Sequence, residues 1–199
     1  MTNLPLTTSI TMGLVLPLFG GCAAPQPLAQ GKKYIVLVGH GIVASDYPKE
    51  RLREWSHGHE HDHSAHTRAD DQSEHARRER EIREWPRTAR TDPYKFAVES
   101  LAERLTKRTG HPVLVAFNEF CSPTLEEAID DAVNQGAERV VVITTMMTPG
   151  GAHSEVDIPE AVEAAAKRHP TVEIVYAWPY DPDRIAATFA DQTRRFDAR

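Results

Sequence analysis

The chain has 199 residues, of which 40% are hydrophobic, and its formal net charge is −6. This length and apolar content suffice for one hydrophobic core, so we expect a single domain with appendages. The negative net charge gives nucleic acid no general electrostatic attraction, and no nucleic-acid partner is expected. The two cysteines, Cys22 and Cys121, stand in unlike contexts, which argues against a disulfide framework.

Residues 1–31 predict a leader followed by a tether. The apolar run ITMGLVLPLF, residues 10–19, has the length of the hydrophobic region of a signal peptide and is too short to span a bilayer as a helix. Two glycines then lead into Cys22, which resembles the cleavage box of bacterial lipoproteins. We therefore expect an exported protein that lipid on Cys22 anchors to a membrane, at the periplasmic or outer face.

Two features of this leader leave alternatives open. No charged residue precedes Lys32, whereas a signal peptide usually begins with Lys or Arg. Phe19 stands where lipoprotein boxes usually carry Leu. The alternatives are another export signal, or no signal and a cytoplasmic location.

The first folded element is expected directly after the tether. KKYIVLVGHG, residues 32–41, is a short continuous apolar run that Gly-His-Gly closes. This pattern is typical of a strand that is buried on both faces.

An insertion, at about residues 45–91, separates this strand from the next helix, where a connection of a few residues is usual. Its first part, HGHEHDHSAH (residues 57–66), has no apolar side chain larger than Ala65, so it predicts a solvated loop. Neutral imidazole is a common metal ligand, and the loop would bind Co²⁺, Ni²⁺ or Zn²⁺ as an accessory site. The imidazoles concerned are those of His57, His59, His61, His63 and His66. The alternative is a polar spacer.

The second part of the insertion, residues 68–90, carries six acidic residues and seven arginines. It predicts an exposed helix that opposite-charge pairs stabilise. We expect Trp55 and Trp85 to anchor the insertion to the domain.

The remaining chain alternates between strand and helix patterns. Three further apolar runs predict buried strands, at residues 112–117, 139–145 and 172–178. Helical periodicity predicts helices at residues 92–110, 122–136, 157–168 and 182–196. Strands that alternate with helices of this length form a parallel sheet with helices on both faces, so the fold class is α/β.

The carboxyl ends of parallel strands meet at one edge of a sheet, where ligands bind. His40 follows the first strand, Glu119 the second and His153 the third. Each has an ordinary alternative, such as a hydrogen bond to the backbone or a carboxylate at a helix start. Together, two histidines and one carboxylate predict a divalent-metal site with open positions. Three sulfur-containing side chains at the same edge are expected to pack rather than bind: Cys121, Met146 and Met147.

Three segments carry a family resemblance. They are YIVLVGHG (34–41), VAFNEFCSPTLEEAIDDAVNQGAERVVVI (115–143) and TPGGAHSEVDIPEAVEAA (148–165). They resemble the small class II tetrapyrrole chelatases, the sirohydrochlorin cobaltochelatase or ferrochelatase type often called CbiX-like. The most specific parts are the His-Gly that ends the first strand, the Glu-x-x-x-Pro-[ST]-Leu stretch from Glu119, and Gly-x-His-x-x-x-Asp-Ile-Pro around His153.

This resemblance implies a chelatase-like three-layer α/β/α fold with a four-stranded parallel sheet over residues 32–199. It implies insertion of Co²⁺, or of Fe²⁺ or Ni²⁺, into a sirohydrochlorin-like tetrapyrrole, with the metal as substrate and no organic cofactor. His40 and His153 would hold the metal, and Glu119 would assist by accepting pyrrole protons. Short members of the family are single α/β halves that dimerise, so a homodimer is implied.

The chain also departs from the family pattern. Ile42-Val43 follows His-Gly where the family usually has Ser-Arg, and the run 144–147 (TTMM) replaces an apolar run that ends in proline. These changes leave the expected ligands in place and alter the walls around the tetrapyrrole. The alternative function is a non-catalytic metal- or tetrapyrrole-binding lipoprotein on the same scaffold.

Overall fold

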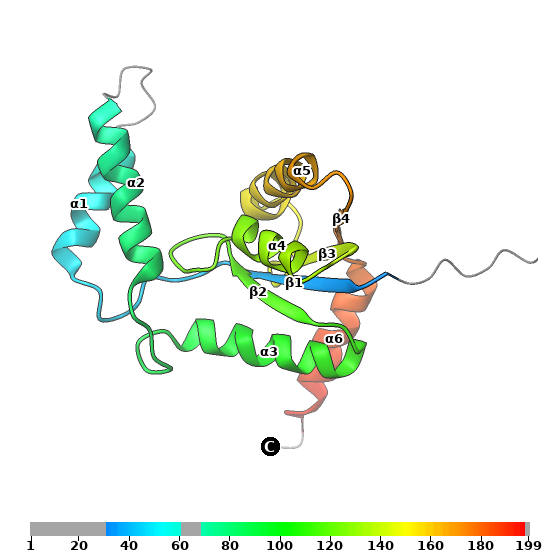
Figure 1. The fold of residues 1–199 in the computed structure, drawn as a ribbon. Coiled ribbons are helices and arrows are strands. Elements are labelled where there is room, and N and C mark those ends of the chain that lie inside the picture. Colours follow the sequence, from blue (N-terminus) through cyan, green and yellow to red (C-terminus); the bar gives the residue numbers. More distant parts are fainter. Residues whose placement is uncertain (1–30, 61–68, 198–199) are drawn as a thin grey trace, which may run out of the picture. The chain divides into compact units, whose positions relative to one another are not determined.

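Four parallel strands form the sheet at the centre of the computed structural model, which describes residues 31–60 and 69–197 (Figure 1). The strands are β1 (Lys33–Gly39), β2 (Val113–Phe117), β3 (Arg139–Thr144) and β4 (Glu173–Tyr176), and their order is β2-β1-β3-β4. The helices that connect or follow them are α3 (Pro93–Thr109), α4 (Leu125–Asn134), α5 (Ile158–Arg168) and α6 (Pro182–Arg194). The predicted four-stranded parallel sheet is confirmed.

Helices cover both faces of the central strand β1 (Figure 1). Successive side chains of a strand point to opposite faces. Val36 and Val38 pack in one cluster with Ile129 of α4 and Ile158 of α5, whereas Leu37 packs with α3 in a second cluster. The three-layer α/β/α arrangement is therefore confirmed as well.

The prediction that all four strands are buried on both faces is wrong for the outer pair. Every residue of β4 is at least partly exposed, and so are Val113, Leu114 and Val115 of β2. These two strands form the edges of the sheet, where a neighbour is present on one side only. Helix α6 also contributes no buried residue.

The predicted boundaries of α3 agree with the structure, and those of α4 differ slightly. Helix α3 begins after Asp92, whose side chain caps it, and ends at Gly110, which has the left-handed φ of 72°. Helix α4 starts at Leu125 instead of at Ser122-Pro123. Thr124 and Glu127 form a reciprocal capping box there, which satisfies two backbone N–H groups at the helix start.

The insertion between β1 and α3 contains two helices, α1 (Lys49–Glu60) and α2 (Ala69–Glu84), which lie side by side (Figure 1). Ion pairs join them between Arg51 and Glu81 and between Arg78 and Glu54. Exposed pairs of this kind contribute only about 0–1 kcal/mol each.

Apolar contacts attach these helices to the rest of the domain. Ile82 of α2 is buried, with 1% of its surface exposed. The indole ring of Trp55 meets the ring of Phe120, in the loop after β2, at 5.6 Å. The ring of Trp85 meets that of Tyr47 edge to face at 5.0 Å, which is a contact within the insertion. Burial of aromatic surface stabilises more than the exposed ion pairs do.

Helix α1 extends into the histidine-rich stretch, so residues 57–60 are helical rather than part of the predicted loop. Of these four residues only Gly58 disfavours a helix strongly. The other predicted accessory ligands, His61, His63 and His66, lie outside the described residues, as does the leader with Cys22. No helix in the described parts of the chain has the length and hydrophobicity needed to cross a membrane.

Candidate metal site

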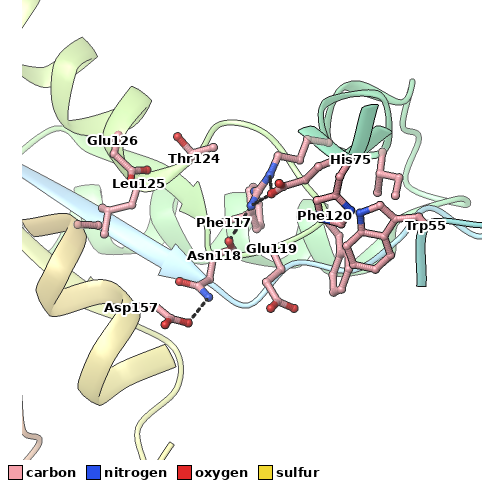
Figure 2. A pocket seen from close by; sticks show the side chains of 14 residues that line it. Trp55, His75, Phe117, Asn118, Glu119, Phe120, Thr124, Leu125, Glu126 and Asp157 are labelled. Carbon is pink, nitrogen blue, oxygen red and sulfur yellow. Dashed lines mark hydrogen bonds and ion pairs between the residues drawn. The ribbon is translucent and has the colours of Figure 1, made fainter. Parts of the chain in front are cut away.

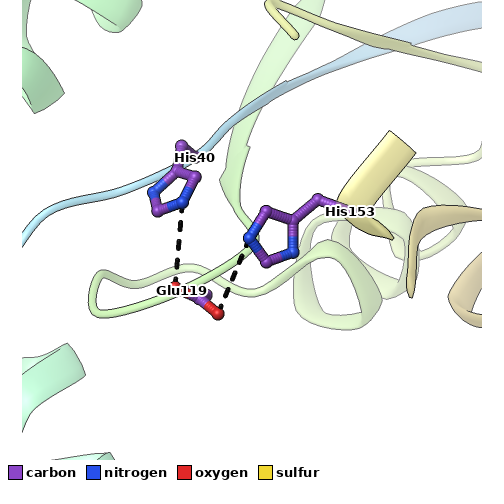
Figure 3. Close-up of side chains that lie close together, drawn as sticks. All are labelled: His40, Glu119 and His153. Carbon is purple, nitrogen blue, oxygen red and sulfur yellow. Dashed lines mark ion pairs between the residues drawn. The ribbon is translucent and has the colours of Figure 1, made fainter. Parts of the chain in front are cut away.

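Three loops at the carboxyl edge of the sheet bring His40, Glu119 and His153 together (Figure 3). His40 directly follows β1, Glu119 lies two residues beyond β2, and His153 begins a π-helical turn, His153–Asp157, that leads into α5. One ligand atom from each side chain lies within 4.8 Å of the others. In each histidine Nε2 lies 3.8 Å from an oxygen of the Glu119 carboxylate. The structure therefore brings together the three side chains that the sequence placed at this edge of the sheet.

The hydrogen bonds of the two imidazoles define which nitrogen faces Glu119. Nδ1 of His40 lies 2.7 Å from the carbonyl oxygen of Gly41, and Nδ1 of His153 lies 2.6 Å from Oδ2 of Asp157. The carbonyl oxygen only accepts, so Nδ1 is the donor in the neutral ring of His40, and its Nε2 carries the lone pair beside the Glu119 carboxylate. Nδ1 of His153 also lies 2.8 Å from the amide nitrogen of Asn118, which only donates, so the two contacts of this nitrogen favour opposite tautomers.

Asp157 contacts His153 of the candidate site, and the sequence reasoning did not select it. It lies four residues after His153 in the π-helical turn, and its carboxylate also accepts a hydrogen bond of 3.3 Å from the amide of Asn118. The hydrogen bond from His153 lowers the pKa of the Asp157 carboxyl, and the bond from Asn118 adds to this effect. A carboxylate that contacts a ligating histidine orients its imidazole ring. The His-x-x-x-Asp spacing was the available signal.

Backbone contacts hold the loops of His40 and Glu119 together. The parallel pairing of β1 and β2 continues beyond the strands, because the N–H groups of Asn118 and Glu119 donate to the carbonyls of Gly39 and His40 at 2.9 and 2.8 Å. Gly41 has a φ of 93°, and a Cβ there would lie 1.9 Å from the carbonyl oxygen of Glu119. Only glycine fits this close approach.

A cavity of about 280 Å³ lies beside Glu119 (Figure 2). Trp55 and His75 of the insertion line it, and their rings stack with centroids 5.8 Å apart. Asn118, Glu119 and Phe120 line it from the loop after β2. The insertion therefore forms part of the wall next to the candidate metal site.

A second cavity, of about 400 Å³, includes His153 in its lining. Most of the exposed lining surface is apolar, and Met146, Met147 and Phe189 contribute to it. Phe189 belongs to α6 and is 58% exposed. An apolar surface thus adjoins one of the two imidazoles.

Cys121 packs in the core and does not reach the ligand atoms. Its side chain is buried together with Leu37, Val98 and Phe117, and this burial raises the pKa of the thiol. Among the described residues, the group of potential ligands contains only His40, Glu119 and His153. The packing role expected for Cys121 agrees with this arrangement.

Comparison with known proteins gives consistent matches. Residues 89–195 match the model of the CbiX family. A sirohydrochlorin ferrochelatase from Priestia megaterium is 34% identical over 41% of this chain and 30% of its own length. A sirohydrochlorin cobaltochelatase from the same organism is 42% identical over 34% of this chain and 22% of its own length. The matched segments thus span less than a third of these relatives.

Solved structures of similar proteins include the sirohydrochlorin chelatase SirB from Bacillus subtilis subspecies spizizenii in complex with cobalt. It is 22% identical, and the similarity covers 82% of this chain and 50% of that chain with a TM-score of 0.45.

Proposed function

The chain belongs to the CbiX family, and on this basis we propose that it is a chelatase that inserts a divalent metal ion into a sirohydrochlorin-like tetrapyrrole. The proposed metal is Co²⁺, with Fe²⁺ and Ni²⁺ as alternatives, because two imidazoles and one carboxylate suit all three ions. The metal is a substrate, and the proposed reaction uses no organic cofactor.

One observation carries this proposal. The Nε2 atoms of His40 and His153 and the carboxylate of Glu119 converge at the edge of the sheet, and none of the three side chains is fully buried. Three protein ligands leave coordination positions of a divalent ion open. Pyrrole nitrogens of a macrocycle would occupy those positions as the ion leaves the imidazoles.

In this proposal Glu119 also accepts the protons that leave the macrocycle. Insertion of one divalent ion replaces two pyrrole N–H protons, so the macrocycle must release two protons for each ion that it gains. A carboxylate beside the metal accepts such protons as a general base. The side chain of Glu119 is 36% exposed, so it would pass each proton on to solvent.

The apolar cavity that includes His153 is the proposed binding site of the macrocycle. A tetrapyrrole has two broad faces of low polarity, and apolar surfaces associate in water. Met147 and Phe189 line this cavity next to an imidazole that would hold the metal. We propose that one face of the macrocycle lies against these side chains.

A single-turnover experiment tests the proposed function. Purified protein loaded with Co²⁺ is mixed with sirohydrochlorin, and absorbance follows the formation of the cobalt complex. We expect formation to be faster than with free Co²⁺ alone, and to lose this acceleration in a His40→Ala, His153→Ala double variant. Tight metal binding without acceleration would support the non-catalytic metal-binding alternative instead.

Deletion of residues 57–66 tests the accessory metal site. We propose that this histidine-rich stretch collects metal ions, and the deletion is expected to reduce the number of Co²⁺, Ni²⁺ or Zn²⁺ ions bound per chain in a calorimetric titration. Because only neutral imidazole binds metal, the difference from the parent chain should shrink below about pH 6.5. An unchanged stoichiometry would contradict the proposal.

Mass spectrometry of the protein from its native membrane fraction tests the lipid anchor. We propose that residues 1–21 are removed and that Cys22 carries lipid, which would place the chain outside the cytoplasm. The expected N-terminal peptide starts at a lipid-modified Cys22. A peptide that begins at Met1 and contains an unmodified Cys22 would rule the anchor out and favour a cytoplasmic location.

A further inference from the structure

One residue of the insertion contacts both ends of the loop that carries Glu119. Nη2 of Arg83 donates to the carbonyl of Asn118 at 3.0 Å, and Nη1 donates to the carbonyl of Cys121 at 3.2 Å. The backbone N–H of Ser122 donates in turn to the carbonyl of Arg83 at 3.2 Å. Arg83 lies in the last turn of α2, so the insertion bonds directly to this loop on either side of Glu119.

The loop needs such bonds because its backbone is strained. Phe120, next to Glu119, has a φ of 54°, which is unusual for a bulky side chain. Such a conformation persists only where the surroundings impose it. Arg87, near the end of the insertion, donates to the carbonyl of Phe120, and the ring of Trp55 packs against the ring of Phe120.

The geometry of Arg83 suits this task better than that of any other cationic side chain. A guanidinium group is planar and donates in two parallel directions, so it bridges two carbonyls that a lysine ammonium would not hold in the same fixed arrangement. Nε of Arg83 also donates to Glu79 at 2.9 Å, which orients the plane of the group. The side chain is only 15% exposed. Arg83 therefore holds the loop from the wall of the cavity that Glu119 also lines.

We infer that Arg83 is a positioning residue, through which the insertion sets the place of the Glu119 carboxylate beside the two imidazoles. This inference rests on the proposed function, because it assigns Glu119 to the metal site. It gives the insertion a role in the site that is independent of the histidine-rich stretch. Arg87 is less suited to a test, since it forms a buried ion pair with Asp92 whose loss would disturb the fold.

A double-mutant cycle on metal binding tests this inference. The dissociation constant for Co²⁺ at the site is measured by the absorption of bound Co²⁺ in four full-length proteins: the parent chain, Arg83→Met, Glu119→Gln and the combination. We expect Arg83→Met to weaken binding about tenfold in the parent, as loss of an outer partner of a ligand does. In the Glu119→Gln background the same change should have an effect of less than about twofold, because the carboxylate that Arg83 positions is gone.

Arg77→Met is the matched control. Arg77 lies on the same helix, is exposed and pairs with Glu74 within that helix, so its loss removes the same charge without touching the loop. We expect no change in Co²⁺ affinity from this substitution in either background.

Three results would overturn the inference. They are an unchanged affinity in Arg83→Met, an equal loss in both backgrounds, and a parent chain that does not bind Co²⁺ beside Glu119. The experiment contains no tetrapyrrole, so a failure of sirohydrochlorin turnover would count against the proposed function and leave the outcome of the cycle unaffected.

Discussion

Replacing His153 by alanine is expected to weaken binding of Co²⁺ at the site by more than about 100-fold. Loss of an outer partner of a metal ligand already costs about 10- to 100-fold in affinity, and here a ligand itself is removed. His40→Ala should act in the same direction but less strongly. The reason is that two side chains, Asp157 and Asn118, hold the ring of His153 in place, whereas the ring of His40 contacts only the carbonyl oxygen of the neighbouring Gly41 through Nδ1. Isothermal titration with Co²⁺ measures both effects.

His111→Ala is the control for these two substitutions. His111 precedes β2, whereas the candidate site follows the carboxyl end of that strand, and its loss should leave the affinity of the site unchanged. Both site histidines are partly exposed, so their replacement should change the melting temperature by only a few degrees. A large fall in melting temperature with intact Co²⁺ binding would identify a structural histidine and contradict the proposed ligand role.

Glu119→Gln is expected to separate metal binding from turnover. Glutamine keeps the size of the side chain and its hydrogen-bonding capacity but cannot accept a proton as a base. Co²⁺ affinity should fall by only about tenfold, because both imidazoles remain and the amide oxygen of glutamine can still bind the ion. The rate of cobalt insertion into sirohydrochlorin under single-turnover conditions should fall by about 100-fold or more, the usual contribution of a general base.

Glu126→Gln is the matched control for this substitution. Glu126 lines the same cavity from the first turn of α4 and is not among the groups that meet the imidazoles. We expect the Glu126→Gln variant to insert cobalt at the wild-type rate. If Glu119→Gln also turned over at the wild-type rate, the pyrrole protons would have to leave by another route.

Sequence patterns predicted the positions of the three candidate ligands because each follows a recognisable strand. The apolar run before His40 and the one before Glu119 are unambiguous, and parallel strands bring their carboxyl ends to one edge. His153 lies nine residues beyond the end of β3, yet it joins the same edge because α5 starts there. The fold class follows from the same alternation of strands and helices.

The bonds of one side chain to distant backbone carbonyls could not be predicted from these patterns. Arg83 in the charged segment 68–90 reads as one of several exposed helix arginines, and its bonds to carbonyls 35 and 38 residues away depend on how α2 docks. Hydrogen bonds to carbonyls leave no signature in residue type. The exposure of β4 was missed for a related reason, because an apolar run does not reveal whether the next helix packs closely on the strand.

The backbone bonds between the loops of His40 and Glu119 would affect the thermodynamics of the proposed metal capture. Main-chain bonds and the close approach of Gly41 hold the backbones of these two proposed ligands together, so their backbone positions would be set before any ion arrives. Binding to a preorganised site loses little conformational entropy. The backbone of a preorganised site also would not move when the ion leaves, so transfer would require only the ion and the flexible macrocycle to move.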